Sequence, residues 1–288
     1  MTTPREILRK HNIRPVKGLG QSFLIDNNIN TKIVESSNIG NDDVVLEIGA
    51  GLGVLTAMLA SCARKVIALE VDPKLLAVLR EELEERANVE IVKQDVMTYD
   101  ISRALDGTRQ AMDVVGKFIV VGNIPYNIAS QIFFRLIRFR ESISSMILMF
   151  QREVAERIIA SPGTKEYGLL SVLASAYTVP SKVLSVSPSC FYPRPKVDST
   201  VVKMTIRDEP IGNVCNDVFF FALVKTALSK RRKTLLNNLK QSTLLQPYDI
   251  DIVDLLNDIG IDGRRRGETL TAEEFAMLCN AILSRKIS

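Results

Sequence analysis

The stretch Val44-Val45-Leu46-Glu47-Ile48-Gly49-Ala50-Gly51-Leu52-Gly53 decides how this chain is expected to fold. Its first five residues, 44–48, are mostly apolar and typical of a buried strand. The glycine-rich turn after them opens a helix from about Val54, and glycines let the backbone of such a turn approach a ligand closely. The dinucleotide fingerprint G-x-G-x-x-G would need glycine where Val54 stands, so the turn argues against a nicotinamide cofactor.

Strands continue to alternate with helical patterns as far as Phe150. Asp72-Pro73 is typical of the start of a helix, with Asp as the cap and Pro at the first helical position. Further strands are predicted at 65–69, 89–93, 118–122 and 146–150, and later strand candidates lie at 181–186 and 199–206. Because this alternation is characteristic of βαβ units, we expect a doubly wound, mainly parallel α/β sheet of the Rossmann-like kind.

The length of the chain suggests two domains. It has 288 residues, and a single domain usually has roughly 100 to 200. The polar segment 208–213 contains proline and glycine and is the expected boundary. Beyond it only helical patterns occur, and helix starts are expected near Asp217, Thr234, Asp249 and Thr271. The prediction is a larger domain over 1–207 and a small all-helical domain over 208–288.

The composition, 46% hydrophobic and 24% charged, describes a globular protein. No apolar run approaches the ~18 residues that a membrane span requires, and nothing resembles a signal peptide, so we expect a cytoplasmic protein. His11 is the sole histidine, and the cysteines are scattered without paired spacing at Cys62, Cys190, Cys215 and Cys279. This pattern argues against a zinc site or a Cys-His nucleophile, and we expect no metal.

Acidic residues end the next two strands. Glu70 follows the glycine turn by about 20 residues, where a carboxylate can accept from both ribose hydroxyls of a cofactor. Asp95 could accept from the amino group of a cofactor adenine whose ring lies between Val71 and Val96. Each acid alone is as compatible with a helix cap or a solvated side chain. Together they favour a site, because open α/β sheets bind ligands at the carboxyl ends of their strands.

The motif Asn123-Ile124-Pro125-Tyr126 follows the strand at 118–122 and suits methylation of a planar amine. The exocyclic amine of adenine is a weak nucleophile because its lone pair is delocalised into the ring. Two acceptors aimed at the amine hydrogens favour the pyramidal form, and the Asn123 side chain and a main-chain carbonyl held by the Pro125 turn can supply them. Tyr126 offers a stacking face. The alternative is a strand that simply ends in a proline turn.

These residues resemble the S-adenosylmethionine-dependent ribosomal RNA adenine dimethyltransferases of the KsgA type, over nearly the whole chain. The motifs that carry the resemblance are, in order, 17–26 (KGLGQSFLID), 49–53 (GAGLG), 70–72 (EVD), 94–96 (QDV), 123–127 (NIPYN) and 191–199 (FYPRPKVDS). The resemblance implies S-adenosylmethionine as the cofactor. The cofactor-binding residues expected on this basis are Gln21, Ser22, Leu24, Gly49, Gly51, Glu70, Val71, Asp95, Val96 and Asn123.

The resemblance also implies the site for the target base. Asn123, the Ile124 carbonyl, Pro125 and Tyr126 would hold the adenine amine and ring, and Phe191 would form a second stacking wall. The chain departs from the family pattern at two positions, with Ser22 where the family usually has Asn and Ala50 where it usually has Pro. Neither departure touches the catalytic motif.

Basic residues suggest where RNA is bound. No acidic residue occurs between Asp217 and Asp249, and Lys230-Arg231-Arg232-Lys233 lies within that interval. We expect this cluster to contact phosphates. Other basic candidates are Arg264-Arg265-Arg266 and the amino-terminal Arg5, Arg9, Lys10, Arg14 and Lys17. The competing interpretation is that such basic runs are only solvated surface.

The resemblance and the motifs predict an enzyme that dimethylates two adjacent adenosines near the 3′ end of small-subunit ribosomal RNA, within a pre-assembled small subunit. The nearest alternative is a relative that methylates large-subunit RNA and confers antibiotic resistance. Against it, residues 230–239 (KRRKTLLNNL) resemble the ribosome-assembly branch. A second alternative is a non-catalytic factor that binds nucleic acid with the same fold. Glu70, Asp95 and the motif at 123–126 argue for catalysis.

Overall fold

The computed structural model describes residues 3–16, 18, 20–112, 116–248 and 250–285. Three residues used in the sequence patterns, Lys17, Leu19 and Asp249, lie outside this part. Contacts between Cα atoms divide the chain into two compact units. Unit 1 contains residues 1–155 and 181–206, and unit 2 contains 156–180 and 207–288.

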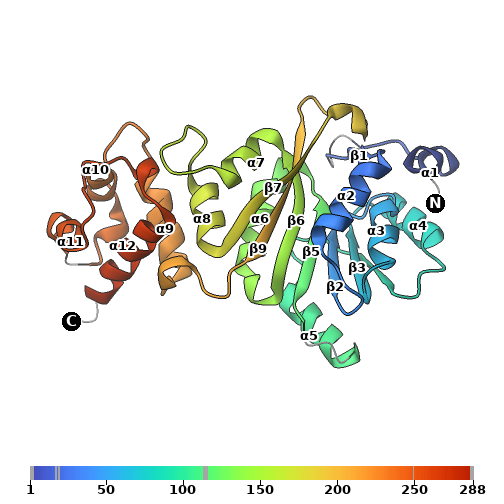
Figure 1. The fold of residues 1–288 in the computed structure, drawn as a ribbon, viewed down its shortest axis with the longest axis horizontal. Helices are drawn as coiled ribbons and strands as arrows, with labels where there is room; N and C mark the ends of the chain where they lie inside the picture. Colours follow the sequence, from blue (N-terminus) through green and yellow to red (C-terminus); the bar gives the residue numbers. More distant parts are fainter. Residues whose placement is uncertain (1–2, 17, 19, 113–115, 249, 286–288) are drawn as a thin grey trace. The chain divides into compact units, whose positions relative to one another are not determined.

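Unit 1 is built on a seven-stranded sheet with the order β4-β3-β2-β5-β6-β9-β7 (Figure 1). The strands are β2 Val44–Ile48, β3 Lys65–Glu70, β4 Val89–Lys93, β5 Phe118–Asn123, β6 Ile143–Gln151, β7 Thr178–Val186 and β9 Ser199–Ile206. Strands β2 to β6 pair in parallel, whereas β9 runs antiparallel to β6. The doubly wound, mainly parallel sheet predicted from the sequence is confirmed.

The centre of the sheet is the point where its strand order reverses. Val45 of β2 lies opposite Val66 of β3 on one side and Ile119 of β5 on the other. The β2–β5 approach is close, because a Cβ on Gly122 would come within 2.6 Å of the Ile48 carbonyl oxygen. The reversal leaves a crevice beyond the carboxyl ends of these two strands.

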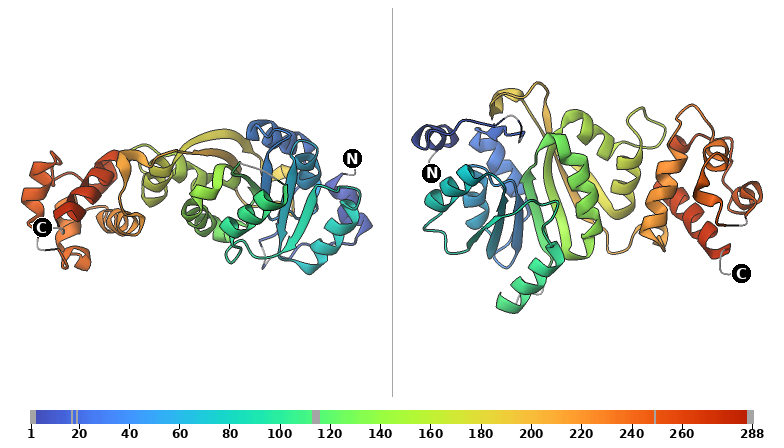
Figure 2. Two further views of the ribbon diagram at one scale, coloured as in Figure 1. Left: turned by 90° about the horizontal axis from the view of Figure 1, so that it is seen from below. Right: turned by 180° about the vertical axis from the view of Figure 1, so that it is seen from behind.

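Helices cover both faces of this sheet. The helices in this part of the chain are α1 Pro4–Lys10, α2 Asn27–Ser37, α3 Val54–Ala60, α4 Pro73–Glu82, α5 Ile101–Met112, α6 Ala129–Arg138 and α7 Arg152–Ile159, the last of which continues into unit 2. Helices α2 and α3 lie on one face and α6 on the other (Figure 2). Ile33 of α2 and Leu59 of α3 share a core cluster with Val45 and Val66 of the sheet. Asp72 caps α4 as predicted, because its side chain accepts from the N–H of Lys74.

A second, two-stranded sheet pairs segments far apart in the sequence. Strand β1, Phe23–Leu24, is antiparallel to β8, Phe191–Tyr192, with Phe23 opposite Tyr192 and Leu24 opposite Phe191. Two-residue strands have no periodicity to detect, so the sequence did not predict them. The pairing brings the amino-terminal segment beside the segment that contains Phe191.

Unit 2 is mainly helical. Its helices beyond α7 are α8 Leu169–Tyr177, α9 Asp217–Ala227, α10 Leu235–Lys240, α11 Ile252–Asp258 and α12 Ala272–Ser284. The predicted starts at Thr234 and Thr271 are caps in the structure, since each side chain accepts a main-chain N–H of the first turn. None of the helices among the described residues is long and apolar enough to span a membrane.

The division between the units differs from the predicted boundary at 207/208 by one residue at Arg207 and by one longer segment. Residues 156–180, expected in the larger domain, group with the carboxyl-terminal helices. Two hydrogen bonds illustrate the reason: the Tyr177 hydroxyl donates to Asp217 Oδ1 (2.7 Å) and the Tyr167 hydroxyl donates to the Leu270 carbonyl (2.7 Å). Such contacts join residues 40 and 103 positions apart, beyond the reach of local sequence patterns.

Candidate active site

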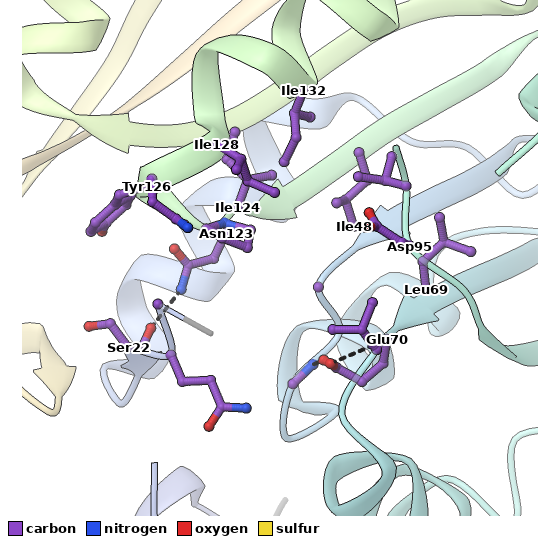
Figure 3. A pocket seen from close by; sticks show the side chains of 18 of the residues that line it. Ser22, Ile48, Leu69, Glu70, Asp95, Asn123, Ile124, Tyr126, Ile128 and Ile132 are labelled. Carbon is purple, nitrogen blue, oxygen red and sulfur yellow. Dashed lines mark hydrogen bonds between the residues drawn. The ribbon is translucent and has the colours of Figure 1, made fainter. Parts of the chain in front are cut away.

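A pocket lies at the carboxyl ends of β2, β3, β4 and β5, where the strand order reverses (Figure 3). Its lining comes from the amino-terminal segment, from these strand ends and from the 3-10 turn Tyr126–Ile128. The predicted site residues that it brings together are Gln21, Ser22, Gly49, Gly51, Glu70, Val71, Asp95, Val96, Asn123, Ile124, Pro125 and Tyr126. The position agrees with where open α/β sheets bind ligands.

The glycine turn provides bare backbone on one side of the pocket. Gly49 and Gly51 have φ angles of +75° and +58°, a left-handed conformation that strains residues with a Cβ. A Cβ on Gly51 would lie 3.5 Å from the Phe23 ring, so a side chain there would fill the space that the turn leaves open. Ala50 donates its N–H to the Leu69 carbonyl (3.1 Å), a bond that a proline at this position could not make.

Glu70 ends β3 with its carboxylate held by main-chain amides. One oxygen accepts from Val71 N–H (2.7 Å) and Asp72 N–H (2.9 Å), and the other accepts from Gly51 N–H (3.0 Å). The residue is buried, with 7% of its surface exposed. A carboxylate has about four acceptor positions, so these three donors leave capacity for a hydroxyl from a ligand. The bonds also tie the glycine turn to the end of β3.

Asp95 and the apolar residues nearby form the far end of the pocket (Figure 3). Asp95 is exposed, and its side chain accepts from the N–H of Met97 (2.8 Å), which orients the carboxylate. Val96 is buried, whereas 45% of Val71 is exposed. An exposed valine beside a pocket offers an apolar surface on which a planar ring can lie.

The amino-terminal segment closes another side of the pocket. The Gln21 side chain accepts from Val16 N–H (2.8 Å) and donates to Asp72 Oδ2 (2.7 Å), which clips the segment to the start of α4. Ser22 follows, and its hydroxyl donates to the Pro193 carbonyl (2.9 Å). The segment is therefore fixed both to the start of α4 and to the chain just after β8.

Asn123 stands at the end of β5 with its two amide atoms in different surroundings. Its Nδ2 donates to the Ser22 carbonyl (3.0 Å), and among the described residues its Oδ1 has no hydrogen-bond donor. The side chain lies between Ser22 and Tyr126 (Figure 3). Pro125 (φ −59°, ψ 123°) turns the chain into the 3-10 turn that begins at Tyr126. The result is an acceptor oxygen held at the edge of the pocket.

Tyr126 is held from behind by strand β9. Its hydroxyl shares a 2.6 Å hydrogen bond with the hydroxyl of Ser199, a fully buried residue. Burial raises the pKa of the Tyr126 hydroxyl, which therefore stays protonated at neutral pH. The fixed oxygen restricts the orientation of the ring.

Leu24 and Phe191 lie outside the main pocket lining, in contrast to the other predicted residues of this region. Phe191 is only 3% exposed and shares a core cluster with Leu24, Ile33 and Val186. Leu24 lines a smaller neighbouring cavity. Strand pairing opposite Leu24 turns the Phe191 ring into the core, whereas the next residue, Tyr192, is 51% exposed.

Glu47, a buried acid beside the main pocket, was not predicted from the sequence. It is 1% exposed, lines the smaller cavity together with Asn30 and Asn123, and its Oε2 has no partner among the described residues. Burial, with a smaller contribution from the Glu70 charge, raises the pKa of Glu47 to about 7. The signal was a glutamate at the fourth position of an otherwise apolar strand. The lining residues Phe23, Gln94 and Ile132 were also missed.

The basic cluster at 230–233 lies in unit 2, with all four side chains exposed. Arg231 pairs with Glu268 (2.8 Å) and donates to the Lys165 carbonyl (2.6 Å), and Lys230 donates to Gln241 (3.0 Å). Within the described part of the chain, Arg232 and Lys233 have no such partner. Two of the four cations are therefore available to an external anion without breaking an internal contact.

One group of potential metal ligands occurs among the described residues. His11, Glu81 and Glu82 come within mutual reach where α1 meets α4. Lys10 already places its ammonium against both carboxylates, at 2.9 Å from Glu81 and 2.7 Å from Glu82. The lysine supplies the positive charge that these acids attract, and the group connects two helices.

Residues 11–282 match the family described as ribosomal RNA adenine dimethylase. A ribosomal RNA small subunit methyltransferase A from Syntrophus aciditrophicus is 46% identical over 98% of this chain and 99% of its own length. Its counterpart from Bacillus thuringiensis is 40% identical over 99% of this chain and 97% of its own length.

Two solved structures share the fold. A dimethyladenosine transferase from Plasmodium falciparum matches with a TM-score of 0.77 at 27% identity, over 90% of this chain and 97% of that one. The 23S rRNA methyltransferase ErmE matches with a TM-score of 0.65 at 26% identity, over 90% and 99%. With the family match covering nearly the whole sequence and the pocket in the expected place, the chain belongs to the ribosomal RNA adenine dimethylase family.

Proposed function

We propose that this pocket transfers methyl groups from S-adenosylmethionine to the exocyclic amines of two adjacent adenosines near the 3′ end of small-subunit ribosomal RNA. The protein is a ribosomal RNA adenine dimethyltransferase by family. The choice of the small subunit rests on the relatives that are 46% and 40% identical, both described as small subunit methyltransferases. The large-subunit alternative is not favoured by these relatives.

The pocket residues suit the cofactor. S-adenosylmethionine carries an activated methyl on a sulfonium, between an adenosine and a methionine part. Glu70 has acceptor capacity for a ribose hydroxyl, and Asp95 can accept from the adenine amine. Val71 and Val96 would flank the adenine ring. Gly49 and Gly51 leave room near the methionine part, and Gln21, Ser22 and Leu24 close that end.

The target adenine would enter beside Asn123. In this arrangement Asn123 Oδ1 and the Ile124 carbonyl accept the two amine hydrogens, and the Tyr126 ring stacks on the base. The single observation that carries this proposal is the orientation of the Asn123 amide, whose donor end is occupied by Ser22. Phe191 would form a second wall only after its ring leaves the core position that it occupies here.

The chemistry requires alignment more than acid or base catalysis. A sulfonium is a good leaving group, so the residues mainly place the amine nitrogen in line with the methyl. The acceptors stabilise the amine as it becomes pyramidal and positive, which is where preorganised dipoles contribute most. The methylated amine can then lose its proton to water. Neither a general base nor a metal is needed for these steps, and we propose that none takes part.

The proposed partner is a pre-assembled small ribosomal subunit, contacted in part by Arg232 and Lys233. Structured RNA is recognised largely through its shape and backbone, which suits a rigid RNA surface formed by assembly. Because unit 2 carries these exposed cations, we propose that unit 1 performs the chemistry and unit 2 contributes RNA binding.

Transfer of labelled methyl groups to unmethylated ribosomal particles tests this function. Small subunits, large subunits and free small-subunit RNA are supplied separately, and modified positions are located by primer extension. We expect two adjacent adenosines near the 3′ end of the small-subunit RNA to become modified in the small subunit. Modification of large-subunit RNA instead, or no transfer to any particle, would overturn the proposal.

A further inference from the structure

Ser22 connects three parts of unit 1 that are distant in sequence. Its main-chain carbonyl accepts from Asn123 Nδ2 (3.0 Å), and its hydroxyl donates to the Pro193 carbonyl (2.9 Å). The preceding residue, Gln21, donates to Asp72 Oδ2 (2.7 Å) beside Glu70. A single short segment therefore touches the cofactor end of the pocket, the catalytic asparagine and the chain after β8.

The first contact determines which end of the Asn123 amide faces the target. A carboxamide has one acceptor oxygen and one donor nitrogen, and only the oxygen can accept an amine hydrogen. The Ser22 carbonyl is itself an acceptor, so it selects the orientation in which Nδ2 points back and Oδ1 is left for the base. Movement of residue 22 would move the partner that sets this orientation.

The second contact holds residue 22 in place. The Ser22 hydroxyl donates its hydrogen to the Pro193 carbonyl, so this hydrogen is not available to a bound cofactor. This bond lies next to the pairs Phe23 with Tyr192 and Leu24 with Phe191, and Ile25 N–H donates to the Cys190 carbonyl (2.8 Å). A two-residue sheet is weak by itself, so one more bond at its end contributes substantially to the register of β1 and β8.

We infer that Ser22 is a positioning residue for the target adenine and that its hydroxyl is not a cofactor ligand in this chain. Through Pro193 the hydroxyl anchors residue 22, and through its carbonyl residue 22 orients Asn123. This inference rests on the proposed function, because it assigns Asn123 the role of accepting from the adenine amine. Losing the hydroxyl should slow methyl transfer to bound RNA while leaving cofactor affinity unchanged.

Two variants of Ser22 and one matched control test this. Ser22→Ala removes the hydroxyl, and Ser22→Thr keeps it. Ser144→Ala is the control, because Ser144 is also a half-buried serine whose hydroxyl donates to a main-chain carbonyl, that of Phe118 (3.2 Å), away from the pocket. Calorimetric titration with S-adenosylhomocysteine measures cofactor-site affinity. Single-turnover transfer to unmethylated small subunits, at increasing subunit concentration, separates the maximal rate from RNA binding.

Ser22→Ala should lower the maximal single-turnover rate roughly threefold to tenfold, the range that one net hydrogen bond supports. Its S-adenosylhomocysteine affinity should stay within about twofold of wild type, and Ser22→Thr and Ser144→Ala should keep most of the rate. If Ser22→Ala binds S-adenosylhomocysteine so much more weakly that this explains its whole loss of rate, the hydroxyl is a cofactor ligand and the inference is overturned. An unchanged rate in Ser22→Ala would also overturn it. If the wild type itself transfers no methyl, the proposed function has failed instead.

Discussion

At the scale of single residues, Asn123 carries the largest expected effect on chemistry. In the proposed arrangement its Oδ1 accepts from the target amine, so its contribution should grow as the amine becomes pyramidal. Asn123→Ala should reduce single-turnover methylation roughly a hundredfold or more, with RNA affinity nearly intact. Labelled-methyl transfer and a separate RNA-binding titration measure the two quantities. A near wild-type rate would exclude the amine-orienting role.

The hydrogen bond between Tyr126 and Ser199 gives a second residue-scale prediction. Tyr126→Phe and Ser199→Ala each remove the same bond, so both should be mild and the double variant should be no worse than either alone. Tyr126→Ala should be severe, because stacking on an aromatic face is worth about 1 to 3 kcal/mol per base. The same single-turnover assay compares all four. Additive losses would show that the two side chains act separately.

Glu47 predicts a pH dependence of stability. Its pKa is raised from 4.5 to about 7 in the folded protein, so between these values the folded state binds more protons than the unfolded state. The contribution of Glu47 to stability therefore decreases as pH rises through this window. The free energy of unfolding that Glu47→Gln gains over wild type should therefore be larger at pH 8 than at pH 5, by on the order of 1 to 3 kcal/mol.

Thermal unfolding of Glu47→Gln and wild type across pH 5 to 8 checks this prediction. Glu84→Gln is a suitable control because Glu84 is exposed. The difference in Tm between Glu47→Gln and wild type should widen toward pH 8, while the control follows wild type. Parallel curves for Glu47→Gln and wild type would mean that Glu47 does not take up a proton on folding in this range.

At the scale of elements, the glycine turn and the end of β3 behave as one structure. Glu70 accepts from the amides of Gly51, Val71 and Asp72, and Asp72 in turn caps α4. Glu70→Ala removes both the proposed ribose acceptor and the tie between these elements. It should weaken cofactor binding by roughly 1 to 3 kcal/mol. Calorimetric titration with S-adenosylmethionine measures this, and unchanged affinity in a folded variant would place the ribose elsewhere.

At the scale of the whole molecule, cofactor binding and RNA binding are expected to be separable. Replacing Arg232 and Lys233 by neutral residues should reduce the slope of log RNA affinity against log salt concentration, by about one for each phosphate contact that is lost. Cofactor affinity should not change. Arg231→Ala is the informative comparison. Because Arg231 pairs with Glu268 and the Lys165 carbonyl, its removal should affect the stability of unit 2 more than the salt slope. An unaltered slope in the Arg232, Lys233 variant would identify the cluster as solvated surface.

The sequence by itself determined the features that depend on neighbours along the chain. Strands β2, β3, β5 and β6 follow from runs of apolar residues, because a buried strand requires them whatever packs against it. The caps at Asp72 and Thr271 follow from side chains that bond to amides two or three residues away. The glycine turn and the Asn123 motif could likewise be predicted, since their backbone geometry is local, and the parallel order of the strands places them at one edge of the sheet.

Tertiary structure alone decided the features that depend on distant partners. The β1–β8 pairing buries Phe191, and residues 156–180 join unit 2 through contacts such as that of Tyr167 with Leu270. Arg231 is distinguished from Arg232 by its contacts with Glu268 and the Lys165 carbonyl, and the orientation of Asn123 depends on Ser22, 101 residues earlier. Hydrogen bonds and burial act over a few ångströms in space, and the chain brings such groups together only when it folds.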